Sequence, residues 1–192
     1  RFPVPGPEAR ARKVHYVPTA ILFEPGGREV LRLEAYFRPF HMAGSLDLYH
    51  YPRNRFVAGF IGSPSMNFLP GRIARATDGG IEVELDGGRK TMVRCRPAGN
   101  GLEGAPVTLG VRPETLHADG SGDSHISGRV YNVERLGGDT YLYLRGPEGK
   151  DITVHAPGDM VVSSGDDVTV GFNGAKCHLF HESGEAFQRL SA

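Results

Sequence analysis

The sequence predicts a mainly β fold built from small antiparallel barrels, with two short helices ahead of the first strand. Residues 81–86 alternate between apolar and acidic side chains, which is the period of a half-buried strand. Asp-Gly-Gly runs stand at 78–80 and 86–88, and they supply the positive φ angles that hairpin turns require. About nine short strand-like segments recur between glycine turns, a pattern typical of antiparallel sheets rather than a parallel sheet.

Two helices are predicted before these strands. Ser45 is a good N-cap for the first helix, and Pro52 ends it. Asn54 caps the second, which stops at the Gly-Ser-Pro run 62–64. We expect the apolar side chains of the second helix to pack in the core: Phe56, Val57, Phe60 and Ile61.

The strands follow in two groups. They are expected at residues 67–76, 81–86, 90–95, 107–112, 125–136, 139–145, 151–155, 167–172 and 176–181. The Pro/Gly-rich stretch 97–106 divides them, which predicts two half-barrels.

Composition excludes several classes of protein. Lys plus Arg equals Asp plus Glu at 22 each, so no bulk charge attracts nucleic acid or an anionic membrane. No apolar run approaches the roughly 18 residues of a membrane-spanning helix. Cys95 and Cys177 could pair, but without a secretory signal we expect them reduced and the chain cytosolic.

Residues 1–42 form a Pro/Arg-rich segment that we leave unassigned. Only residues 28–37 suggest a short strand or helix. The segment is either a native extension or sequence of foreign or rearranged origin. We expect it to be unnecessary for the fold of residues 43–192.

Four stretches carry a resemblance to a known family. Residues 45–70, SLDLYHYPRNRFVAGFIGSPSMNFLP, resemble the point in sugar-importer ABC ATPases at which the nucleotide-binding domain ends and the C-terminal regulatory domain begins. Residues 109–114 (LGVRPE), 128–137 (GRVYNVERLG) and 171–190 then resemble the transport-associated OB domain of these ATPases, in the family's order. The match is closest to the maltose and glycerol-phosphate type of importer. Thr115 stands where that family usually has a histidine.

This resemblance implies a helical remnant of the ATPase domain at 43–62 and a double OB-like regulatory domain at 63–192. In the family this domain contacts its twin and receives inhibitory signals, which implies a homodimer, permease subunits and an inhibitory regulator as partners. It also implies a cytoplasmic position, peripheral to the inner membrane through these partners and without direct membrane insertion.

ATP and magnesium are implied only for the full-length family. A phosphate-binding loop needs Gly-Lys followed by Ser or Thr, but Gly149-Lys150 is followed by Asp151, with Leu144 at the position of the first glycine. The Leu-Ser-Gly-Gly-Gln signature is absent as well. We therefore expect no catalytic residues, no cofactor and no ATPase activity in this chain.

The candidate interface residues are Phe68, Arg112, Pro113 and Glu114. Pro113 restricts Arg112 to an extended conformation and removes a backbone donor, so we expect the strand to end there with both charges pointing outward. Such a corner is either a contact surface or a solvated strand end with a local ion pair.

Two other binding functions stay open. An OB-type barrel suggests single-stranded nucleic acid, because aromatic and basic residues interleave on two strands: Arg129, Tyr131, Arg135, Tyr141, Tyr143 and Arg145. The charge balance argues against this reading. Oxyanion (molybdate-like) binding, by analogy with related OB modules, would use backbone N–H groups at 63–67 or 137–138.

Metal binding and hydrolysis have weaker support. Cys177, His178 and His181, with a remote Cys95, give only a weak zinc pattern, because no second Cys-x-x-Cys accompanies them. No Gly-x-Ser-x-Gly nucleophile motif is present. We expect no metal site.

Overall fold

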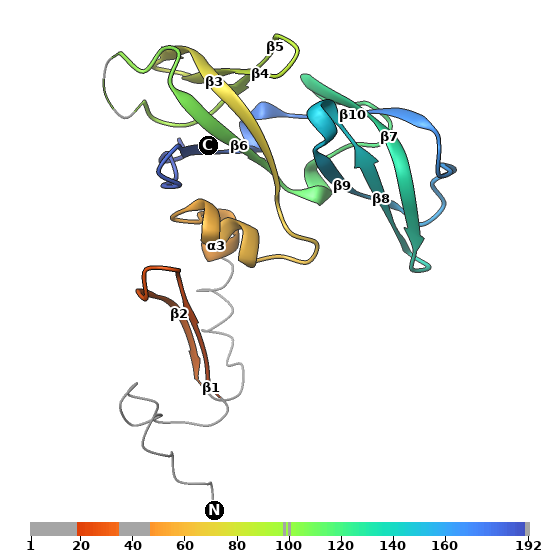
Figure 1. Ribbon diagram of the computed structural model, residues 1–192, viewed down its shortest axis with the longest axis horizontal. Coiled ribbons are helices and arrows are strands. Elements are labelled where there is room, and N and C mark those ends of the chain that lie inside the picture. Colours follow the sequence, from red (N-terminus) through yellow and green to blue (C-terminus); the bar gives the residue numbers. More distant parts are fainter. Residues whose placement is uncertain (1–18, 35–46, 98, 100, 191–192) are drawn as a thin grey trace, which may run out of the picture. The chain divides into compact units, whose positions relative to one another are not determined.

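The computed structural model describes residues 19–34, 47–97, 99 and 101–190 (Figure 1). The chain divides into two compact units, residues 1–52 and 53–192, and each is described by itself. The domain boundaries expected after residues 42 and 62 remain predictions.

The first unit contains a β-hairpin. Strand β1 (Thr19–Phe23) pairs antiparallel with β2 (Glu29–Glu34), and Arg28 Nε donates to Glu24 Oε1 at 2.5 Å across the turn. Residues 28–37 were expected to form a short strand or helix, and the described part of this range forms strand β2. Strand β1 was not expected. Residues 47–50 are helical, as predicted for the first helix.

The second unit opens with helix α3 (Arg55–Phe60). The Asn54 side chain accepts a hydrogen bond from the backbone N–H of Val57 at 2.9 Å, which confirms the predicted N-cap. The expected burial is correct for Val57 but wrong for the two aromatic residues, because Phe56 and Phe60 are 36% and 59% exposed. This six-residue helix has room to bury only one narrow face, and that face carries Val57 and Ala58.

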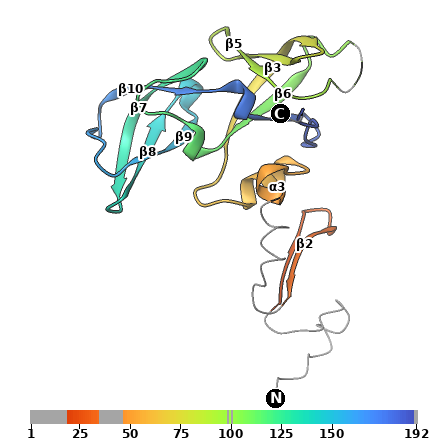
Figure 2. The same ribbon diagram turned by 180° about the vertical axis from the view of Figure 1, so that it is seen from behind.

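Nine strands follow, the expected number, and form two curled antiparallel sheets. The first sheet has the order β11-β6-β3-β4-β5 and the second β10-β7-β8-β9, and the two lie side by side in both views (Figures 1 and 2). The bounds are β3 (Asn67–Thr77), β4 (Gly80–Leu85), β5 (Arg89–Val93), β6 (Pro106–Val111), β7 (Ser124–Arg135), β8 (Asp139–Arg145), β9 (Asp151–Pro157), β10 (Asp167–Phe172) and β11 (His178–His181). Three 3₁₀ turns connect them: η1 (Pro113–Thr115), η2 (Pro147–Gly149) and η3 (Gly174–Lys176). The mainly β, OB-like prediction is confirmed. The expectation that residues 97–106 divide the strands into the two groups is wrong, because β6 and β11 follow this stretch and pair within the first sheet.

One hydrophobic core serves both sheets. Ile81 and Val83 of β4 are fully buried, as their alternation predicted, and so are Leu142 and Leu144 of β8. Leu85 is only half-buried. Because the inner faces of the two sheets share this core, the second unit has a hydrophobic core of its own.

Polar links also join the sheets. The carboxamide of Asn67 in β3 donates to the carbonyl of Thr153 in β9 and accepts from its N–H, both at 2.8 Å. The Asn67 side chain therefore provides hydrogen-bond partners for both backbone groups of Thr153, which lies on an edge strand of the second sheet. On the other side, Ser124 Oγ of β7 donates to Thr91 Oγ1 of β5 at 2.7 Å, and both side chains are buried. No described helix is long and apolar enough to cross a membrane.

Candidate functional site

Arg112 connects the end of β6 to helix α3. Arg112 is 4% exposed, and its Nη1 donates to the carbonyls of Ala58 and Ile61 at 3.1 and 2.5 Å. The last carbonyls of a helix have no partner within the helix and carry partial negative charge, so the guanidinium serves as a C-terminal cap. The expectation that Arg112 points outward is therefore wrong, because α3 packs against this corner and offers acceptors there.

The other candidate interface residues surround this joint. Pro113 is buried at the start of η1, whereas Glu114 is exposed. Phe68 lies on the neighbouring strand, half-buried, with its ring edge-on to Phe180 at 5.9 Å. A Cβ at Gly59 would lie 3.2 Å from the Phe68 ring, so a glycine in α3 leaves room for this ring. Of the four candidates, Phe68 and Glu114 present surface to solvent.

Helix α3 has an aromatic outer face that the sequence reading assigned to the core. Phe56 and Phe60 lie one turn apart with their rings stacked at 6.3 Å. Exposed apolar patches commonly mark surfaces that another protein part covers. The signal available in the sequence was the i, i+4 spacing of these rings.

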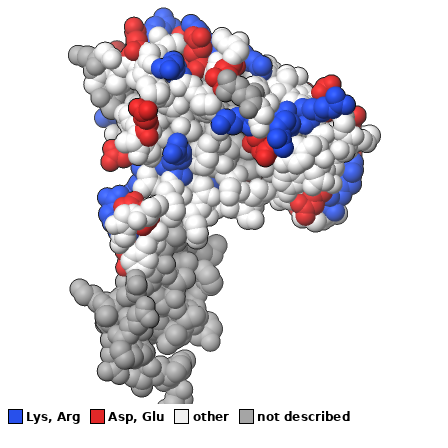
Figure 3. Space-filling model, in the orientation of Figure 1, with Lys and Arg blue, Asp and Glu red and all other residues white. Residues whose placement is uncertain are grey.

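The outer face of the second sheet carries the tyrosines considered for nucleic-acid stacking. Their neighbours already occupy them: Tyr141 stacks on His155 at 5.1 Å, the Arg145 guanidinium lies 5.2 Å from the Tyr131 ring, and the Tyr143 hydroxyl donates to Glu134 at 2.9 Å. Acidic and basic side chains also interleave over the face seen in Figure 3. This arrangement gives no support to a stacking platform for nucleic acid.

The thiols and histidines are not brought together as a metal site. Within the described ranges, no group of three or more His, Cys, Asp or Glu residues could hold a metal ion. Cys95 and Cys177 are buried free thiols, and burial raises the pKa of each to about 12. His181 instead stacks on Phe187, with ring centroids 3.6 Å apart.

Each of the two segments considered for oxyanion binding makes an internal hydrogen bond through a side chain or a carbonyl oxygen. Asn67 uses its side chain on Thr153. The carbonyl of Gly138 accepts from the N–H of Gly158 at 3.0 Å, and a Cβ at Gly158 would lie 2.0 Å from the carbonyl oxygen of Gly137. Oxyanion binding at these segments stays a prediction.

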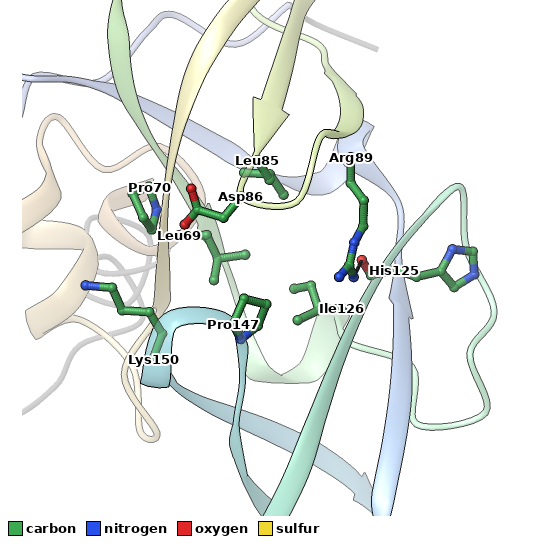
Figure 4. Close-up of a pocket in the computed structure, with 9 residues that line it drawn as sticks. All are labelled: Leu69, Pro70, Leu85, Asp86, Arg89, His125, Ile126, Pro147 and Lys150. Carbon is green, nitrogen blue, oxygen red and sulfur yellow. Dashed lines mark hydrogen bonds between the residues drawn. The ribbon is translucent and has the colours of Figure 1, made fainter.

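A small crevice of about 30 Å³ lies between the two sheets (Figure 4). Nine of the described residues line it: Leu69, Pro70, Leu85, Asp86, Arg89, His125, Ile126, Pro147 and Lys150. The side chains of Lys150 and Arg89 stand on opposite sides of it, with apolar side chains between them. Sequence reasoning missed this site, because its lining comes from segments far apart in the chain.

A larger groove of about 660 Å³ lies on the first sheet. Arg55 and Arg72 line it together with Glu84, Asp86 and Glu182. Since both signs of charge share this open groove, its lining favours no ligand of one charge.

Family models place the second unit among known domains. The MalK OB fold domain matches residues 62–116, and the TOBE domain matches residues 109–180. The maltose/maltodextrin import ATP-binding protein MalK of Vibrio cholerae is 41% identical to this chain over 147 residues. The MalK protein of Aliivibrio fischeri is 40% identical over 146 residues. Each of these matches covers 76% of this chain and 39% of the relative. The Yersinia pestis protein is 38% identical over 147 residues with the same coverage. The chain thus spans about two-fifths of the length of these relatives.

A solved structure shares the fold. The molybdate-binding protein ModG, crystallised with molybdate bound, has a TM-score of 0.50 and 18% sequence identity over 59% of this chain and 94% of its own. At this identity the likeness concerns the fold alone.

Proposed function

Because the chain belongs to the family of C-terminal OB-fold and TOBE domains of MalK-type proteins, we propose that it is the regulatory and dimerisation part of the ATP-binding subunit of a carbohydrate ABC importer. The observation that carries this proposal is the consecutive match of both domain models, which overlap at residues 109–116 and together span residues 62–180. In the structure these residues build both sheets and their common core.

The chain itself would not bind or hydrolyse ATP. The two matched models describe OB and TOBE domains, and the sequence lacks the phosphate-binding loop and the signature motif of an ABC ATPase. Isothermal titration of the full chain with Mg-ATP should show no heat of binding. Saturable binding in the micromolar range would refute this part of the proposal.

The aromatic face of α3 would contact the ATP-binding domain of the longer subunit. Phe56 and Phe60 are exposed immediately ahead of the matched region, and the relatives hold much more chain than the part matched here. The joint at Arg112 ties α3 to the first sheet. A force on α3 from that domain would therefore reach the first sheet directly.

The regulatory role would also include self-association of the chain through a two-fold contact. Permease subunits and an inhibitory regulator would be further partners. The protein would then lie at the cytoplasmic side of the inner membrane. Phe68 and Glu114 remain the candidate contact residues because both reach the surface. Without an ATP-binding domain the contact would be small, so we expect dissociation constants in the micromolar range.

Sedimentation velocity of the full chain over a concentration series tests the dimer. The expected result is a shift from monomer to dimer as concentration rises, and Glu114→Lys should weaken it. A strict monomer at every concentration would remove dimerisation from this chain. An undiminished dimer with Glu114→Lys and Phe68→Ala would move the contact elsewhere.

A further inference from the structure

We infer that the crevice between the two sheets binds a small organic monoanion, with its aliphatic end inside the crevice and its charged end at the mouth. The inference does not depend on the importer function. It rests on the shape, lining and charge of this crevice (Figure 4).

The crevice is held open by contacts between the two sheets. Arg89, at the start of β5, donates through Nη1 to the backbone carbonyl of His125 in β7 at 3.1 Å. The Asn67–Thr153 link and the buried Ser124–Thr91 bond join the same sheets at other points. Because several links set the separation of the sheets, the crevice is a built feature of the fold.

The floor of the crevice is apolar. Leu69 and Ile126 are 7% and 4% exposed, and Leu85, Pro70 and Pro147 complete it. A volume of about 30 Å³ holds one or two water molecules, but an ordered water needs two to four polar partners, which the apolar side chains of this floor do not supply. A short aliphatic group gains free energy by leaving water for such a surface, so it suits the space better than water does.

Among the lining side chains that the structure describes, basic groups outnumber acidic ones at the mouth of the crevice. Lys150 and Arg89 stand on opposite sides, and Asp86 is the one carboxylate among these described side chains. Among the side chains that the structure describes, no ion pair neutralises Lys150 or Asp86. The His125 ring points away from the crevice. The mouth therefore favours a single negative charge near Lys150 and Arg89, while Asp86 disfavours a second one.

Affinity for so small a ligand is expected to be weak. Only a few atoms of the ligand fit the crevice, and the basic side chains at its mouth, Lys150 and Arg89, are solvent-exposed. Ligand-efficiency limits for fragments then place the dissociation constant in the millimolar range.

Titration of the full chain by NMR tests the site. The methyl signals of Leu69, Leu85 and Ile126 would be followed with sodium butyrate, with 1-butanol and with inorganic phosphate at equal ionic strength. Butyrate should shift these signals saturably, and both other probes should act much more weakly. Equal shifts with butanol would mean a purely apolar site, equal shifts with phosphate a purely ionic one, and unmoved methyl signals no site; each result would overturn the proposal.

Three substitutions make the test specific. Lys150→Gln should weaken butyrate binding about two- to fivefold, the size of one surface charge interaction. Asp86→Asn should strengthen it by a similar factor because it removes the opposing charge. Lys90→Gln is the matched control, since Lys90 lies next to Arg89 but points to Glu82 and Glu84 at 3.9 and 4.0 Å. If Lys150→Gln or Asp86→Asn left the affinity at the Lys90→Gln value, the inference would fail.

Discussion

Replacing Arg112 by methionine should destabilise the second unit strongly. The substitution keeps a long side chain but removes both charge-assisted hydrogen bonds to the carbonyls of Ala58 and Ile61 at the end of α3. Each such bond contributes about 1.5–3 kcal/mol. The gain from no longer burying a charged group offsets part of that loss. We expect a net loss of about 2–4 kcal/mol, which for a chain of this size lowers the melting temperature by roughly 5–15 °C.

Urea unfolding of the full chain, followed by circular dichroism, measures this loss. Arg75→Met is the matched control, because Arg75 is an exposed arginine on β3 and should change the free energy of unfolding by less than about 0.5 kcal/mol. If Arg112→Met were no more destabilising than Arg75→Met, Arg112 would not act as the cap of α3. If Arg112→Met kept a normal free energy of unfolding but lost dimerisation, Arg112 would instead be a residue of the dimer interface.

Three further predictions concern the stability of the fold. A chain starting at Met42 should keep its strand-rich circular dichroism and lose at most a few degrees of melting temperature, since residues 53–192 form a compact unit of their own; loss of cooperative unfolding would refute this. Asn67→Ala should reduce the free energy of unfolding by about 2–4 kcal/mol, because the N–H and the carbonyl of Thr153 in β9 lose their hydrogen-bond partner. The control Asn132→Ala changes an exposed asparagine and should leave the free energy of unfolding nearly unchanged. Burial raises the pKa of Cys95 and Cys177 to about 12, against 9.0 for a free thiol. The thiols of the folded chain should therefore resist iodoacetamide at pH 8 and react with it in urea. The stability linked to the neutral thiols should be fully present below about pH 9 and fall as the pH rises toward 12.

Local sequence patterns predicted most of the second unit. The alternation at 81–86, its flanking Asp-Gly-Gly turns and the Asn54 cap are each encoded within a few residues, so β4 and the start of α3 followed directly. Strand β1 was missed because its short apolar run lacks alternation, and such runs do not separate strand from helix or loop.

The candidate site was harder to predict because it depends on contacts between distant segments. The direction of Arg112 is set by a helix about fifty residues earlier in the chain, and no local pattern around Pro113 reveals it. The exposure of Phe56 and Phe60 depends on which face of a six-residue helix meets the sheet. The crevice likewise forms only when η2 and β7 meet β3 and the β4–β5 turn.

The most direct test of the regulatory role is a domain exchange in the Vibrio cholerae relative. Its matched C-terminal region would be replaced by residues 53–192 of this chain, and ATP-driven maltose uptake would be measured in proteoliposomes beside the intact subunit and a version truncated before that region. The account predicts a dimeric exchanged subunit whose uptake resembles that of the intact protein. A folded exchanged subunit that behaves like the truncated one would contradict it.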